Sequence, residues 1–136
     1  MLSALALSAV LLNPDVRPDT IQQTICRPGY SATVRPSVSY TNPIKFRMMD
    51  REGLPREGAK DWALDHRLAI GLGGHPRQLD NLQLLTRSEN GRKSRIEAKM
   101  ICYVCKGVMP LDQAQVEVWE DWRAAYRRWA SVKCRR

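Results

Sequence analysis

Asp65 and His66 stand side by side directly after the apolar triplet 62–64, and Asn81 and Asn90 follow within the next twenty-five residues. An imidazole titrates near pH ~6.5, so His66 can accept a proton from water at neutral pH. Carboxylate and amide oxygens suit a hard divalent cation. A base for water and a cation on the phosphoryl group are what phosphodiester hydrolysis requires. These residue types could therefore perform that hydrolysis if the fold brings them together.

The elements that must position these side chains can be predicted from the apolar pattern. We expect a short strand that ends on Asp65 and His66, a glycine-rich loop at 71–74, and a second strand at 82–85. Ser88 is a candidate cap for a following helix that continues to about residue 105 and is stopped by Gly107. Adjacent strand residues point to opposite faces, so Asp65 and His66 would need a twist or bulge to serve one site.

These residues also carry a family resemblance. The succession Asp65-His66, Gly73-Gly74, Asp80-Asn81-Leu82-Gln83-Leu84-Leu85, Asn90 and Lys93 resembles the HNH endonucleases of bacterial and phage type. Those enzymes have a ββα-metal core, or His-Me finger, that binds one divalent cation and cleaves phosphodiesters. The stretch from Cys26-Arg27-Pro28-Gly29-Tyr30 through Val34-Arg35-Pro36 to residues 39–42 is similar to a segment ahead of the finger in one bacterial branch.

The resemblance implies roles for four residues. His66 would be the general base, Asp65 and Asn90 would be metal ligands, and Asn81 would hold the loop and orient the imidazole. The cofactor would be one divalent ion. Mg²⁺ is favoured by the oxygen ligands, with Mn²⁺, Ni²⁺ and Zn²⁺ as alternatives. Many relatives have histidine where Asn90 stands, so the softer ions fit this sequence less well.

The expected function is metal-dependent endonuclease activity on nucleic acid, with DNA favoured. The net charge of +8 permits a polyanionic partner. Arg92, Lys93 and Arg95 follow Asn90 and are expected to contact phosphates, although they could form only a solvated helix face. His75 is expected to be solvated. The alternatives are a basic nucleic-acid-binding module that keeps the finger without turnover, and a secreted toxin or interaction domain that uses it as a scaffold.

The domain organisation follows from length and pattern. Residues 1–12 are almost wholly apolar, too short to span a membrane, and fit a signal peptide or an apolar terminal segment packed on the core. Residues 13–136 form one α+β domain, with a finger core at 62–104 and a C-terminal helix at 111–132. Residues 13–42, called the arm, are expected to be extended. Asn42-Pro43 would begin a short helix through 49. The sequence carries no signal for an oligomeric state.

The last helix has an aromatic stripe that could stack nucleobases, but packing on the core is the favoured interpretation, because a chain of this size needs that apolar area. The stripe consists of Trp119, Trp122, Tyr126 and Trp129.

The chain has four cysteines, which allow three disulfide connectivities or one Cys₄ zinc site. The similar bacterial branch has a cysteine at the positions that correspond to Cys26 and Cys105. The resemblance therefore implies that these two cysteines pair, which leaves Cys102 to pair with Cys134. A secreted or extracytoplasmic location is favoured if residues 1–12 are a leader. In a cytosolic protein, four reduced thiols would be expected instead.

Overall fold

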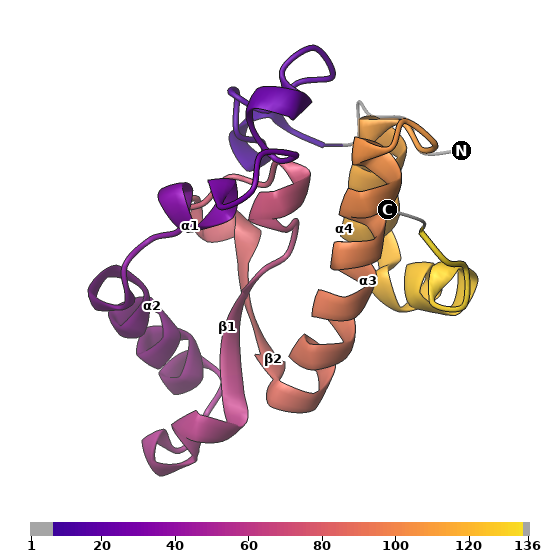
Figure 1. Cartoon of the computed structure of the whole chain (residues 1–136). Coiled ribbons are helices and arrows are strands. Elements are labelled where there is room, and N and C mark those ends of the chain that lie inside the picture. Colours follow the sequence, from indigo (N-terminus) through magenta and orange to yellow (C-terminus); the bar gives the residue numbers. More distant parts are fainter. Residues whose placement is uncertain (1–6, 135–136) are drawn as a thin grey trace.

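The computed structural model describes residues 7–134, in which helices precede and follow a β-hairpin (Figure 1). The helices and strands are α1 (Tyr30–Val34), α2 (Val38–Arg51), β1 (Trp62–His66), β2 (Leu82–Thr86), α3 (Arg87–Cys105) and α4 (Leu111–Trp129). Short 3-10 turns occupy Ala9–Leu11, Ile21–Gln23, Arg56–Asp61, Ile70–Leu72 and Leu79–Asn81. The α+β class expected from the sequence is confirmed as a two-stranded antiparallel hairpin followed by two long packed helices.

The hairpin lies in the middle of the molecule, with α2 on one side and α3 and α4 on the other (Figure 1). Its antiparallel register runs without a break from the pair Trp62–Thr86 to the pair His66–Leu82. Burial alternates along β1, so that Asp65 shares the buried face with Ala63, whereas His66 is only half-buried. The predicted strand and its end at Asp65 and His66 are therefore confirmed.

Helix α3 begins two residues earlier than the start predicted from the sequence. Thr86 is the N-cap, because its hydroxyl accepts a hydrogen bond from the Glu89 N–H at 3.1 Å. The Glu89 carboxylate in turn accepts one from the Thr86 N–H at 3.3 Å, which completes a capping box. The prediction of Ser88 as the cap was wrong, since Ser88 lies within the first helical turn. The C-terminal end is as predicted, with Gly107 at φ 75° after the last turn.

The arm is less extended than predicted, because α1 and the start of α2 lie within it. Helix α2 is capped by Ser37, whose hydroxyl accepts a hydrogen bond from the Tyr40 N–H at 3.3 Å. Asn42 and Pro43 are therefore inside this helix rather than at its start. Proline in a helix leaves the carbonyl four residues earlier without its usual donor. Pro43 and Ser39 are both exposed, so water can satisfy the Ser39 carbonyl.

Helix α4 packs along α3 and completes the core. Trp122 is buried, and Trp119, Tyr126 and Trp129 are partly buried against the same apolar cluster, which confirms core packing for the aromatic stripe. The helix ends at Trp129, earlier than the predicted Val132, and the backbone is non-helical at Asp121. None of the helices within residues 7–134 is long and apolar enough to cross a membrane.

Half of the apolar N-terminal segment, residues 1–6, lies outside the described residues. The other half packs against the glycine-rich loop. Leu7 is buried, Leu12 forms an isolated antiparallel bridge with Gly74, and the His75 N–H donates to the Leu11 carbonyl at 2.8 Å. Residues 7–12 thus have the place expected of a terminal segment on the core.

Both disulfides have the pairing that the resemblance implies. Cys26 pairs with Cys105 and Cys102 pairs with Cys134, so that one helix, α3, is joined to the arm and to the C-terminal tail. No free cysteine remains, which excludes the Cys₄ zinc alternative for this structure. Cys102 and Cys105 lie three residues apart on one helix and reach different partners.

Removal of a disulfide is expected to lower the free energy of unfolding by ~2–5 kcal/mol in a domain of this size. The Cys26–Cys105 bridge spans 79 residues and the Cys102–Cys134 bridge spans 32. A longer closed loop restricts the unfolded chain more, so the double serine variant at 26 and 105 should lose about 0.8 kcal/mol more than the one at 102 and 134. Urea denaturation of both variants measures the difference. The reverse order would contradict the loop-entropy explanation.

Candidate active site

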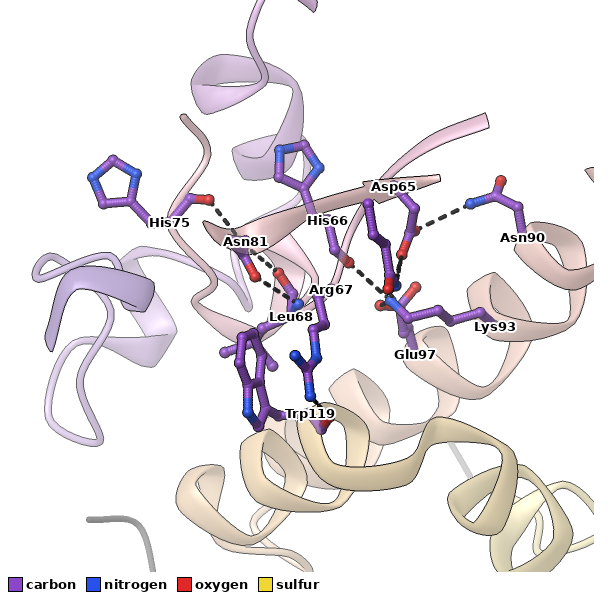
Figure 2. Close-up of polar contacts among 11 residues, drawn as sticks. Asp65, His66, Arg67, Leu68, His75, Asn81, Asn90, Lys93, Glu97 and Trp119 are labelled. Carbon is purple, nitrogen blue, oxygen red and sulfur yellow. Dashed lines mark hydrogen bonds and ion pairs between the residues drawn. The ribbon is translucent and has the colours of Figure 1, made fainter. Parts of the chain in front are cut away.

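Asp65 and His66 line one cavity, and the strand has no bulge there, which leaves a twist as the other device that the sequence interpretation named. Both residues line a cavity of about 280 Å³ at the end of β1, and the register there is regular. Asn90, in the first turns of α3, lines the same cavity. Figure 2 shows the Asp65 carboxylate and the His66 ring on different sides of the strand. The paired register ends with His66 and Leu82, directly beside this cavity.

The Asp65 carboxylate is bound by three side chains. Its Oδ1 accepts a hydrogen bond from Asn90 Nδ2 at 3.1 Å, and its Oδ2 accepts one from Gln83 Nε2 at 3.0 Å. Lys93 Nζ lies 3.0 Å from the same Oδ2. The structure therefore brings the two predicted metal ligands, Asp65 and Asn90, into direct contact (Figure 2).

Lys93 is completely buried, and its prediction as a nucleic-acid-binding residue was wrong for this structure. Its ammonium group donates to Glu97 Oε2 at 2.6 Å and to the His66 carbonyl at 2.9 Å, in addition to its ion pair with Asp65. A phosphate has no access to a cation enclosed in this way. The lysine instead links the end of β1 to α3 and compensates the charge of two buried carboxylates.

Arg92 and Arg95 remain candidates for phosphate contact. Both are exposed, and their spacing of three residues places them on one side of α3. His75, the other histidine, is half-buried in the loop, where its Nδ1 accepts hydrogen bonds from the Arg77 and Gln78 N–H groups at 3.1 and 3.2 Å. Those bonds orient the His75 ring within its own loop.

The His66 ring is held in a defined tautomer. Its Nε2 lies 2.8 Å from the Pro76 carbonyl oxygen, which can only accept a hydrogen bond. Nε2 therefore carries the proton, and in the neutral ring Nδ1 has the lone pair that accepts a proton. Burial lowers the pKa of His66, and this outweighs the bond to Pro76 and the nearby Asp65 charge, which raise it. The ring is neutral over a wider pH range than an exposed histidine.

Asn81 holds the loop but does not contact the imidazole. Its side chain is completely buried, accepts from the Leu68 N–H at 2.8 Å, and donates to the Leu68 and His75 carbonyls at 3.0 and 2.9 Å. The structural part of its prediction fits these contacts. The ring itself is bound by the Pro76 carbonyl, which follows His75 in the same loop. Gly74 is required beside it, since a Cβ there would collide with the Leu68 carbonyl.

Two charged residues at this cavity, Glu97 and Arg35, were not identified as site residues from the sequence. Glu97 stands four residues after Lys93, a spacing that places both on one face of a helix and could have revealed the pair. Arg35 follows α1 and is exposed. It lines the cavity, and its charge lowers the pKa of both His66 and Glu97. No local pattern indicated that contribution.

Burial raises the pKa of Glu97 to about 7, against the opposing effect of Lys93. A carboxyl group with a raised folded-state pKa stabilises the protein at low pH, and that stabilisation is lost as the pH rises through the folded pKa. Between pH 5 and 8, we expect the free energy of unfolding of the parent to fall by about 2–3 kcal/mol relative to Glu97→Gln. Urea denaturation in EDTA at both pH values measures this. A pH-independent difference would contradict it.

Asp65 and Asn90 fit a hard divalent cation as two of its ligands. Asp65 Oδ1 and Asn90 Nδ2 are 3.1 Å apart, close to the roughly 2.9 Å between adjacent oxygens around an octahedral Mg²⁺ with bonds of about 2.0–2.1 Å. Rotation of the amide would present its oxygen instead of its nitrogen. Residues 7–134 contain no group of three or more histidine, cysteine or acidic side chains placed to hold a metal. Water and a substrate phosphate would have to complete the coordination.

Comparison of the chain with protein-family models, curated proteins and solved structures finds no match.

Proposed function

We propose that this chain is a metal-dependent endonuclease that hydrolyses phosphodiester bonds of nucleic acid, with DNA as the favoured substrate. The hairpin and α3 would form a ββα-metal finger, with His66 at the end of its first strand and Asn90 on its helix. The observation that carries the proposal is the His66 ring, whose Nε2–H donates to the Pro76 carbonyl and whose Nδ1 remains a proton acceptor. This arrangement is the one that a general base for water requires.

The remaining side chains support hydrolysis in specific ways. His66 would take the proton from the attacking water at Nδ1, and its low pKa keeps it neutral for this task. Lys93 and Gln83 fix one oxygen of Asp65, which leaves the other facing Asn90. A divalent cation held by Asp65 and Asn90 would supply Lewis-acid stabilisation of the charge on the phosphoryl group. Arg35 would place a positive charge at the lining of the same cavity.

A second candidate function is a basic nucleic-acid-binding module without turnover. It is favoured by the engagement of the Asp65 carboxylate, because both of its oxygens already have hydrogen-bonding partners. A cation would have to displace the Asn90 amide hydrogen from Oδ1. Salt-dependent binding of DNA without cleavage would distinguish this function from the first.

The location that we propose is extracytoplasmic, because an oxidising compartment preserves disulfides. Both bridges join α3 to segments distant in the sequence. The cytosol would reduce them and remove the restriction that they place on the unfolded chain.

Plasmid nicking tests the enzymatic proposal. The oxidised protein should convert supercoiled plasmid to the nicked form with Mg²⁺, and EDTA should stop the reaction. The same assay with Mn²⁺, Ni²⁺ and Zn²⁺ identifies the preferred ion. Asn90→Ala should require a higher ion concentration for the same rate, because it removes one ligand while Lys93 still holds Asp65. Absence of nicking with every ion, together with DNA binding, would select the binding module.

A further inference from the structure

A second cavity adjoins the candidate active site. Its volume is about 600 Å³, and it shares the lining residues Ser31, Gly71, Ala98 and Ile101 with the 280 Å³ cavity beside Asp65. The two cavities therefore form one groove that runs between residues 25–35 of the arm and α3. We call it the arm groove. One end lies at His66 and Asn90, and the other lies at the Cys26–Cys105 bridge.

The walls of the arm groove are fixed by contacts within the fold. The Cys26–Cys105 disulfide joins the arm wall to α3. Tyr30 is buried, and its hydroxyl accepts a hydrogen bond from Asn13 Nδ2 at 3.1 Å. On the opposite wall, α3 presents the small exposed side chain of Ala98. A groove between a tethered arm and a small side chain can stay open for a ligand.

The chemistry of the lining selects the ligand. Arg27, Arg35 and Lys106 are exposed cations along the groove. The larger cavity is lined by apolar atoms of residues such as Ile25, Pro28 and Ile101. Among the described residues 7–134, no acidic residue lines this cavity.

The two carboxylates at the other end, Asp65 and Glu97, both face the Lys93 ammonium group. A ligand that combines repeated negative charge with apolar groups fits this lining, and a nucleotide chain is such a ligand. The two cavity volumes lie within or near the ~300–1,000 Å³ of small-ligand pockets, so the groove can hold an unpaired base.

We infer that the arm groove binds a single strand of nucleic acid next to the bond that is cleaved. Its phosphates lie along Arg27, Arg35 and Lys106, where the guanidinium groups can each make two parallel hydrogen bonds to phosphate oxygens. A base rests on the apolar surface formed by Ile25 and Ile101. Bases paired in a duplex cannot enter, so the groove prefers unpaired strands. The inference rests on the proposed function for the position of the cleaved bond at His66.

Binding of a fluorescein-labelled oligo(dT) strand tests the groove independently of turnover. The full chain, with both disulfides intact, is titrated in EDTA and followed by fluorescence anisotropy. Oligo(dT) should bind more tightly than the corresponding oligo(dA)·oligo(dT) duplex. Ala98→Trp fills the groove and should weaken strand binding by about tenfold or more, whereas the matched Ala98→Ser should bind within about twofold of the parent. Thermal unfolding verifies that both variants are folded.

The rim cations have a separate signature in the salt dependence. Arg27→Ala and Lys106→Ala should each flatten the slope of log affinity against log salt by about 0.7, the value for one phosphate contact on a single strand. Arg127→Ala is the matched control, because Arg127 is an exposed arginine on α4, outside the groove lining, and its slope should equal that of the parent.

Three results would overturn the inference. They are unchanged strand binding by Ala98→Trp, tighter binding of the duplex than of the strand, and competition by poly-glutamate as strong as that by unlabelled oligo(dT), which would assign the groove to an acidic peptide.

The failure of the proposed function can be distinguished from the failure of this inference. If His66→Ala nicks plasmid like the parent while Ala98→Trp loses strand binding, the groove stands and the enzymatic role of His66 does not. If nicking depends on His66 while Ala98→Trp binds the strand normally, the enzymatic role of His66 stands and the strand-binding role of the arm groove does not.

Discussion

His66→Ala is expected to slow plasmid nicking by about 10²–10⁴-fold, the usual contribution of a positioned general base. The variant removes the proton acceptor but leaves the contacts of Asp65, Asn90 and Lys93 in place, because the His66 ring makes none of them. The hydrogen bond to Pro76 is lost, and that loss should lower the free energy of unfolding by about 1 kcal/mol. Nicking rates at saturating Mg²⁺, with urea denaturation of the same samples, measure both effects.

The other histidine provides the control for this experiment. His75 accepts two backbone hydrogen bonds through Nδ1 and is absent from the cavity lining, so His75→Ala should nick at close to the parental rate. Nicking by the parent should decline as the pH falls through the His66 pKa, because the protonated ring accepts no proton. Burial lowers that pKa, so the midpoint should lie below ~6.5. Parental activity in His66→Ala would show that His66 is not the general base.

Lys93→Met is expected to lower the free energy of unfolding by about 3–5 kcal/mol at pH 8. The methionine keeps most of the apolar volume of the lysine but removes the cation shared by Asp65 and Glu97, which are 7% and 8% exposed. Two buried carboxylates would then lack their common partner. At pH 5 the loss should be smaller, because Glu97, whose pKa is about 7, is then protonated in the parent as well. Urea denaturation at both pH values measures the difference.

The neighbouring residue gives a matched control for Lys93. Arg92 is an exposed cation on the same helix, so Arg92→Ala should change the free energy of unfolding by no more than about 0.5 kcal/mol. Combining Lys93→Met with Glu97→Leu should cost less than the sum of the single changes, because the double variant removes one of the stranded carboxylates. Additive losses, or a Lys93→Met protein as stable as the parent at pH 8, would show that the buried ion pairs do not couple.

Local sequence was sufficient for the elements around the site. The sequence predicted the end of β1 at Asp65 and His66, the second strand and the long helix α3. These predictions were possible because apolar residues recur with a different spacing in strands and in helices. The cap of α3 was also present in the sequence, since Thr86 and Glu89 have the spacing of a capping box. The cysteine pairing came from the family resemblance rather than from spacing, which left three connectivities open.

The tertiary structure decided how each polar residue is used. Position on α3 made Lys93 and Arg92 equivalent candidates for a phosphate, but packing against β1 buries the first and leaves the second exposed. The burial of a charge depends on which carboxylates other elements bring to it, and those of Asp65 and Glu97 meet only when β1 lies on α3. Arg35 lines the same cavity from the arm, a segment distant in the sequence from both β1 and α3. The sequence by itself determined which groups could act, whereas contacts between elements distant in the chain determined which of them are accessible.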